Sequence, residues 1–241
     1  NFWRSLANLT INVNVGGKTG CPAAGEFWAV SQAAPMRRVH VNGFATLMDF
    51  CTAPSFASGG FIADSLFTGS TIVNGSQQQW LVRNSNIDGW TNGVWNQVFA
   101  GVENAPAQSY PNPPYTTLAT NPASRERPFL YVDSKGGYNV YVPDAQFDSS
   151  GTTWANGQTP GHSLSIDTFF IAKPGDNVKD INNALSRGKN VLFTPGVYDI
   201  DRTIKVKHAG TIVLGLGMAT LTAEDGVVPM DVADQEGIEV S

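Results

Sequence analysis

The sequence predicts an all-β protein built as a solenoid of parallel strands. Charged residues make up only 15% of the 241 residues, and 25 residues are glycine. Helical proteins rely on Glu, Lys and Arg, so this composition favours strands and turns. Short β-rich runs recur at intervals of roughly 15 to 30 residues, as successive turns of a solenoid would. A β-sandwich is the alternative, since Asn-Gly at 42–43 and 74–75 also occurs in hairpins.

Five β-rich runs separated by Gly, Asn and Asp fill the first hundred residues. They are Leu6–Val13, Met36–Gly43, Gly59–Phe67, Gln78–Ile87 and Gly93–Val102.

Alternation predicts which side chains of these runs face the core. With Trp80 and Val82 inside, Asn84 becomes an inward amide at a corner. The same pattern turns four side chains outward, namely Gln77, Gln79, Leu81 and Arg83. In the second run, Val39 and Val41 point inward, while Arg38 and His40 point outward.

The chain divides into three predicted segments. Residues 1–102 form the C-terminal coils of a first solenoid, and 103–168 form a Pro-rich linker with a hairpin around Gly136 and Gly137. Residues 169–241 form the capped start of a second solenoid. Its cap is a short helix begun by Asp176 and ended by Gly188, with an apolar face of Val178, Ile181, Ala184 and Leu185. Both ends of the chain are expected to cut through a coil of a longer protein.

The charge and cysteine content narrow the class of partner. A net charge of −5 without a basic run argues against nucleic acid. No apolar run approaches the roughly 20 residues of a membrane span. Without a CxxC or His-rich cluster, we expect no metal and no cofactor. We expect Cys21 and Cys51 to form one disulfide, with two buried thiols as the alternative, and the sequons at Asn8 and Asn74 favour secretion.

Four motifs together resemble family 55 glycoside hydrolases, the pectate-lyase-like β-1,3-glucanases. They are "FWAVSQAAPMRRVHV" (27–41), "SGGFIADSLFTG" (58–69), "GSQQQWLVRN" (75–84) and "VWNQVFAGV" (94–102). Their order and spacing match the family's, and the chain looks like a divergent member. The resemblance implies two tandem right-handed parallel β-helices with a sugar cleft between them, and an inverting, exo-acting hydrolysis of β-glucan.

The resemblance also implies roles for individual residues. Gln32 and Ser58 would position the attacking water, whereas without it they are a structural amide and a turn residue. The general acid, a Glu in this family, is expected beyond Ser241, so the 241-residue chain alone should be nearly inactive.

Polar and aromatic side chains near the coil corners are the predicted sugar contacts. Gln77, Gln79 and Arg83 would bind hydroxyl groups along a groove that faces the second solenoid. Trp90 and Trp95 lie near coil corners, and one of them would face the cleft and stack on a sugar ring.

Other functions remain open from the sequence. Asp64, Asp88 and Glu103 are candidates for a second carboxylate, or else capping residues of turns. A polysaccharide lyase and a non-catalytic glycan-binding or adhesive β-helix are the alternatives to a hydrolase. In each case the partners are a polysaccharide or oligosaccharide and the remainder of the same polypeptide.

Overall fold

The computed structural model describes residues 4–13, 26–28, 34–48, 57–75 and 78–241. The chain forms two compact units. Unit 1 comprises Asn1–Arg125 and Ala145–Pro160, and unit 2 comprises Glu126–Asp144 and Gly161–Ser241. Both consist mostly of strands, as the composition predicts. Among the described residues, no helix has the length and apolarity needed to cross a bilayer.

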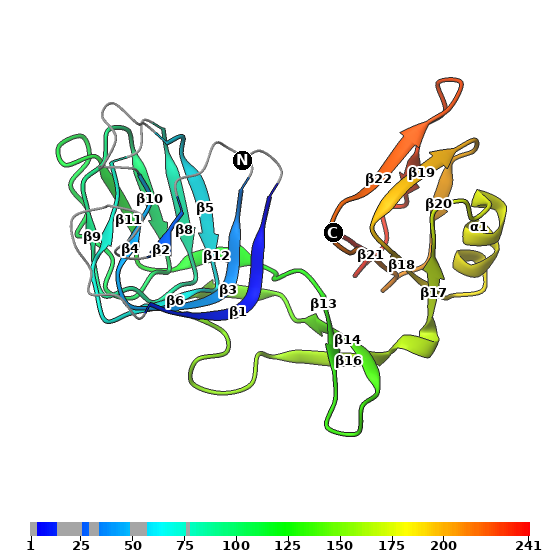
Figure 1. Cartoon of the computed structure of the whole chain (residues 1–241), viewed down its shortest axis with the longest axis horizontal. Coiled ribbons are helices and arrows are strands. Elements are labelled where there is room, and N and C mark those ends of the chain that lie inside the picture. The colour runs from blue at the N-terminus through cyan, green and yellow to red at the C-terminus, as the bar shows by residue number, and fades with distance from the viewer. Residues whose placement is uncertain (1–3, 14–25, 29–33, 49–56, 76–77) are drawn as a thin grey trace. The chain divides into compact units, whose positions relative to one another are not determined.

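Most strands of unit 1 belong to two parallel sheets, and the chain passes back and forth between them (Figure 1). The larger sheet contains β1 (Leu6–Asn12), β3 (Met36–Asn42), β5 (Gly60–Ala63), β6 (Leu66–Thr68), β8 (Trp80–Arg83), β10 (Gln97–Ala100) and β11 (Tyr115–Leu118). The smaller sheet contains β2 (Glu26–Phe27), β4 (Ala45–Thr46), β7 (Ile72–Val73) and β9 (Trp90–Thr91). All five predicted runs contribute to the larger sheet, so the parallel pairing expected of them is present.

The core of unit 1 depends on the register of three neighbouring strands. Ile62, Val82 and Phe99 lie opposite one another on β5, β8 and β10, and all three are fully buried. Trp80 is also fully buried, as alternation predicts, and its ring packs edge-on against Trp90. Phe99 in turn packs edge-on against the Trp90 ring.

One corner of unit 1 repeats the same unusual backbone conformation in successive turns. Asn8, Arg38, Asp64, Asn84 and Gly101 follow equivalent strand positions, and their φ angles are 58°, 54°, 48°, 44° and 61°. Left-handed backbone is costly for residues other than glycine, and Asn and Asp tolerate it best. The corner therefore requires side chains that compensate for this cost.

Side-chain hydrogen bonds stabilise this corner. The amide of Asn84 donates to Ser149 at 2.8 Å, and its oxygen accepts from Asn121 at 2.7 Å. The guanidinium of Arg38 donates to Asp64 at 2.9 Å, where the carboxylate is completely buried. The same carboxylate accepts from the backbone N–H of Thr153 at 2.6 Å. Residues 145–160 are thus fastened to the corner, although Ser149 follows Asn84 by 65 positions and Thr153 follows Asp64 by 89.

The Pro-rich segment contributes more strands than the sequence predicts. β11 extends the larger sheet in register with β10, and β12 (Asn121–Ser124) pairs antiparallel with β15 (Gln146–Ser149). The sequences of β11 and β12 do not alternate between apolar and polar residues. These two strands form because each pairs with the edge of another strand, β10 or β15.

Unit 2 combines parallel pairs with one small antiparallel sheet. The expected hairpin forms between β13 (Phe129–Val132) and β14 (Tyr138–Pro143), and β16 (Gly161–Ser165) joins it. The Asp133 carboxylate accepts the backbone N–H groups of Gly137 and Lys135, which lowers its pKa. The parallel strands are β17 (Phe169–Ala172), β18 (Asn190–Phe193), β19 (Gly196–Ile200), β20 (Ile204–Val206), β21 (Ile212–Gly215), β22 (Ala219–Ala223), β23 (Met230–Val232) and β24 (Glu239–Val240).

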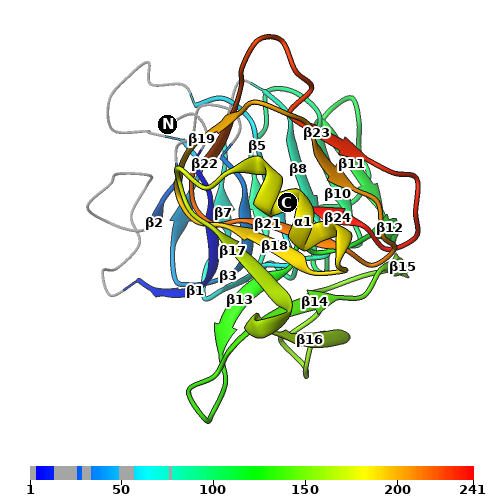
Figure 2. The same ribbon diagram turned by 90° about the vertical axis from the view of Figure 1, so that its right-hand side faces the viewer.

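The single helix described, α1 (Val178–Ser186), follows a 3₁₀ turn at Ile166–Thr168 and strand β17, and it packs against β17, β18 and β20 (Figure 2). Its predicted apolar face of Val178, Ile181, Ala184 and Leu185 is buried. The predicted cap is wrong by one residue. Asn177 caps the helix by accepting from the N–H of Lys179, while Asp176 accepts from the N–H of Lys173 and closes the preceding turn.

Two predictions about covalent modification fare differently. Cys21 and Cys51 lie outside the described residues, so their disulfide stays a prediction. Asn74 is fully buried and donates its amide to Gln97 at 2.9 Å, and a glycan on that nitrogen does not fit the folded protein. Asn8 is exposed.

We predict that Phe99→Ala destabilises unit 1 by about 3–5 kcal/mol, because it removes a fully buried ring from an aromatic stack. Chemical denaturation monitored by tryptophan fluorescence measures the loss. Val94→Ala is the control, since that side chain is 56% exposed and should change stability little. Equal losses in the two variants would contradict the assignment of Phe99 to the core.

Candidate functional site

Three polar residues meet where β5, β8 and β10 begin. Gly60, Trp80 and Gln97 are paired in register. The residues that precede them therefore lie side by side at the end of the larger sheet where these strands begin. They are Gly59 with Ser58 before it, Gln79, and Asn96. We call Ser58, Gln79 and Asn96 the amide edge. Ser58 is half-buried and Gln79 is exposed. The structure therefore brings two of the predicted site residues together.

Glycine at two positions makes this close approach possible. A Cβ on Gly59 would overlap the backbone carbonyl oxygen of Gln79, and one on Gly60 would lie 2.6 Å from the Trp80 ring. Only residues without a side chain fit between these strands. The "SGG" motif is thus a packing requirement of the edge, because it lets Gly59 lie against the Gln79 backbone, with Ser58 one residue earlier.

A buried amide pair supports the edge from below. Gln97 and Asn74 are both completely buried, and Asn74 donates to the Gln97 oxygen. The Gln97 nitrogen donates to the backbone carbonyls of Trp95 and, at 3.5 Å, Gln78. One carboxamide therefore ties the segments entering β8 and β10 together. The sequence analysis did not single out Asn74 and Gln97 as members of this network, although the Asn96-Gln97 pair where β10 begins was a visible signal.

The two candidate tryptophans, Trp90 and Trp95, differ in how far they are exposed to solvent. Trp95 is 59% exposed and lies next to Asn96 at the edge, where an indole can stack on the apolar face of a sugar. Trp90 is only 7% exposed and packs against Trp80 and Phe99. Of the two candidates, Trp90 is therefore a core residue, because alternation along β9 turns its ring inward, and Trp95 stays the predicted sugar contact.

Arg83 lies away from the amide edge. It ends β8, four residues after Gln79, which corresponds to about 13 Å along a strand. Its guanidinium lies 5.5 Å from the centre of the Phe61 ring, and that of Arg37 lies 4.5 Å from the same ring. Arg83 therefore belongs to a cation–π cluster on the outer face of the sheet.

The candidate carboxylates of unit 1 are engaged in the fold. Asp64 is buried against Arg38, as described above. Asp88 accepts from the N–H of Gly69 at 2.6 Å, and Glu103 accepts from the Asn86 amide at 2.6 Å. In the described residues, these three acids act as turn and corner partners. Gln32 and Gln77 lie outside the described residues, so their predicted roles are not placed by the structure.

Comparison with known proteins shows what this chain is similar to. Residues 169–241 match the LAM55 pectate lyase-like domain. This match lies in unit 2, outside the four motifs, and together with the relatives described next it confirms the resemblance to pectate-lyase-like family 55 proteins.

A characterised relative is similar along the whole chain. An exo-beta-1,3-glucanase of Streptomyces sp. (strain SirexAA-E / ActE) is 49% identical over 245 aligned residues, which cover 100% of this chain and 38% of that protein. The solved structure of sacteLam55A from Streptomyces sp. SirexAA-E has a TM-score of 0.90 at 48% identity, covering 100% of this chain and 42% of that one. A variant of sacteLam55A in complex with glucose has a TM-score of 0.88 at 45% identity, covering 100% and 41%.

We predict that Gly59→Ala disrupts the amide edge and lowers the free energy of unfolding by at least about 2 kcal/mol, because the new methyl group would overlap the Gln79 backbone. Thermal or chemical denaturation measures the effect. The matched control is Gly157→Ala, since a Cβ on Gly157 meets nothing within 4 Å and its φ is not in the left-handed region. A Gly59→Ala protein as stable as the control would show that the strands can separate at no cost.

Proposed function

We propose that this chain is part of a secreted glycoside hydrolase that acts on β-1,3-glucan from a chain end, with inversion at the anomeric carbon. In this proposal residues 1–102 and residues 169–241 are portions of two right-handed parallel β-helices, and residues 103–168 link them. The partners are a polysaccharide or oligosaccharide and the remainder of the same polypeptide.

The observation that carries the proposal is the 49% identity to an exo-beta-1,3-glucanase across the entire chain. The chain spans 38% of that relative's length, so the activity is proposed for the full-length protein. A relative that binds glucose supports a carbohydrate substrate.

The amide edge supplies the groups that such a substrate needs. Neutral amides and hydroxyls can each donate to and accept from sugar hydroxyls without the desolvation cost of burying a charge. Gln79 offers an exposed carboxamide, Ser58 offers a hydroxyl, and Trp95 offers an exposed aromatic face. Asn96 offers its amide nitrogen, since its side-chain oxygen accepts from the Thr116 hydroxyl at 2.8 Å. We assign Ser58 and Gln32 to the attacking water, and Gln79 with Trp95 to the sugar.

The first test compares substrates and chain lengths. We expect the full-length protein to release reducing sugar from laminarin, and to release none from pectin under the same conditions. The 241-residue chain should be nearly inactive, because the proposed general acid is absent from it. Release of unsaturated sugars from pectin would identify a lyase, and binding of laminarin without hydrolysis would identify a glycan-binding protein.

The second test separates water positioning from sugar binding. Gln32→Ala in the full-length protein should lower kcat by about 10²-fold or more with little change in KM, as loss of a preorganised polar contact does. Gln79→Ala should instead raise KM, because a ground-state sugar contact is lost.

Gln235→Ala is the control for these kinetic measurements. It removes an exposed glutamine of unit 2 and should change neither constant. Near-normal turnover by Gln32→Ala on a good substrate would rule out its role with water, while a selective loss of kcat in Gln79→Ala would reverse the two assignments.

A further inference from the structure

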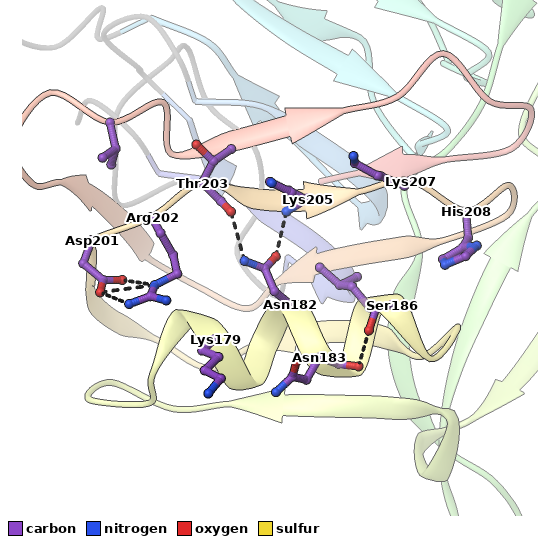
Figure 3. Close-up of a pocket in the computed structure, with 12 residues that line it drawn as sticks. Lys179, Asn182, Asn183, Ser186, Asp201, Arg202, Thr203, Lys205, Lys207 and His208 are labelled. Carbon is purple, nitrogen blue, oxygen red and sulfur yellow. Dashed lines mark hydrogen bonds and ion pairs between the residues drawn. The ribbon is translucent and has the colours of Figure 1, made fainter.

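A pocket of about 690 Å³ lies wholly within unit 2, between α1 and the chain around β20. Its size is within the range of small-molecule sites. Figure 3 shows helix side chains along one wall and the side chains of residues 201–208 along the other. The lining residues are Lys179, Asn182, Asn183, Leu185, Ser186, Asp201, Arg202, Thr203, Lys205, Lys207, His208 and Val227.

The walls are held together by one carboxamide that imitates a neighbouring strand. Asn182 donates to the backbone oxygen of Thr203 at 3.0 Å and accepts from the backbone N–H of Lys205 at 2.8 Å (Figure 3). β20 pairs on its other edge with β23. Asn182 therefore satisfies the free edge of β20 and fixes the distance between helix and strand, so the pocket is a built feature of the fold.

The chemistry of the lining is basic on a chain whose net charge is −5. The lining contains one carboxylate, Asp201, and four side chains with a permanent positive charge, namely Lys179, Arg202, Lys205 and Lys207. Arg202 already pairs with Asp201 at 2.9 Å, and that contact lowers the pKa of Asp201 and raises the pKa of Arg202. Three lysines are left over, and none of their ammonium groups pairs with a carboxylate in the part of the chain that the structure describes.

The placement of these lysines follows from secondary structure. Ile204 and Val206 are buried in the core, so alternation turns Lys205 and Lys207 to the same outer side of the chain. Two residues of a strand place their Cα atoms about 6.5–7 Å apart. Lys179, Asn183 and Ser186 lie three or four residues apart on α1, opposite its buried apolar face. Charges and hydroxyl-binding groups are therefore interleaved around one space.

Among the lining residues that the structure describes there is no Trp, Tyr or Phe. Neutral sugars and unpaired nucleobases both bind largely by stacking on such rings. Binding in this pocket must depend instead on charge and hydrogen bonds. Ammonium groups favour carboxylate or sulfate, while Asn183, Ser186 and Thr203 suit the hydroxyls of a sugar ring.

We propose that this basic pocket binds an anionic saccharide whose sugar units carry carboxylate or sulfate groups. In this proposal the negative charge of the saccharide provides most of the affinity, through the lysine ammonium groups, and hydrogen bonds to its hydroxyl groups provide the specificity. The proposal does not rest on glucan hydrolysis, because it uses other residues and a different ligand.

Calorimetric titration of the protein with tetrasaccharides tests the proposal. An oligogalacturonate supplies carboxylates, a heparin-derived tetrasaccharide supplies sulfates, and laminaritetraose is the neutral counterpart. We expect the anionic probes to bind, at least one of them about tenfold or more tightly than laminaritetraose, with an affinity that falls as salt is added. The tighter of the two anionic probes identifies the preferred charged group. Failure of both to bind, or equal binding of the neutral probe, would overturn the proposal.

The double variant Lys205→Gln/Lys207→Gln should weaken binding of the anionic probe by about tenfold or more. Both side chains are exposed, so the fold should be retained. The matched control is Lys135→Gln/Lys173→Gln, which removes the same charge from exposed positions of unit 2 outside the pocket. Equal weakening by the control variant would show that binding depends only on the overall charge of the protein, and this would contradict a binding site in the pocket. Inorganic sulfate binding as tightly as the tetrasaccharide would show that the sugar contributes nothing.

Discussion

The in-register stacking of parallel strands is the constraint on which unit 1 depends. Once Gly60, Trp80 and Gln97 lie opposite one another, Ile62, Val82 and Phe99 must stack in the core. A slip of one residue would turn every one of these side chains to the other face of the sheet. The aromatic stack of Trp80, Trp90 and Phe99 makes such a slip costly, because it would expose large apolar surfaces.

The same register explains why polar residues gather at two places. At the beginning of the strands it aligns Gly59, Gln79 and Asn96, with Ser58 one residue earlier, and at their end it aligns the left-handed corner residues. The two alignments differ in what satisfies them. The corner is closed by residues 145–160 of the chain itself, through contacts such as Asp64 with Thr153. Gln79 and Trp95 remain exposed at the amide edge, and this makes the edge the better candidate for a ligand.

Several asparagine and glutamine side chains make hydrogen bonds that a neighbouring backbone peptide group would otherwise make. Asn84 completes a corner, Gln97 joins two entering segments, and Asn182 takes the place of a strand beside β20. A carboxamide has one donor group and one acceptor group in the geometry of a peptide, so it can end or bridge a ladder without bringing in charge. This use of amides accounts for a fold with few charged residues. It also means that an amide-rich sequence is not by itself a sign of sugar binding, as Asn74 and Gln97 show.

The sequence by itself determined the strand content, the inward positions of Trp80 and Val82, the apolar face of α1 and the resemblance to the pectate-lyase-like family. These follow from local periodicity and contiguous motifs, which do not need a partner. The tertiary structure alone decided that Trp90 is core and Trp95 exposed, that Arg83 stands apart from Gln79, and that β11 joins the larger sheet. It also brought three lysines from a helix and a strand around one pocket. In each case the outcome depends on which strand edge or turn meets the residue, and that contact is made by residues far away in the sequence.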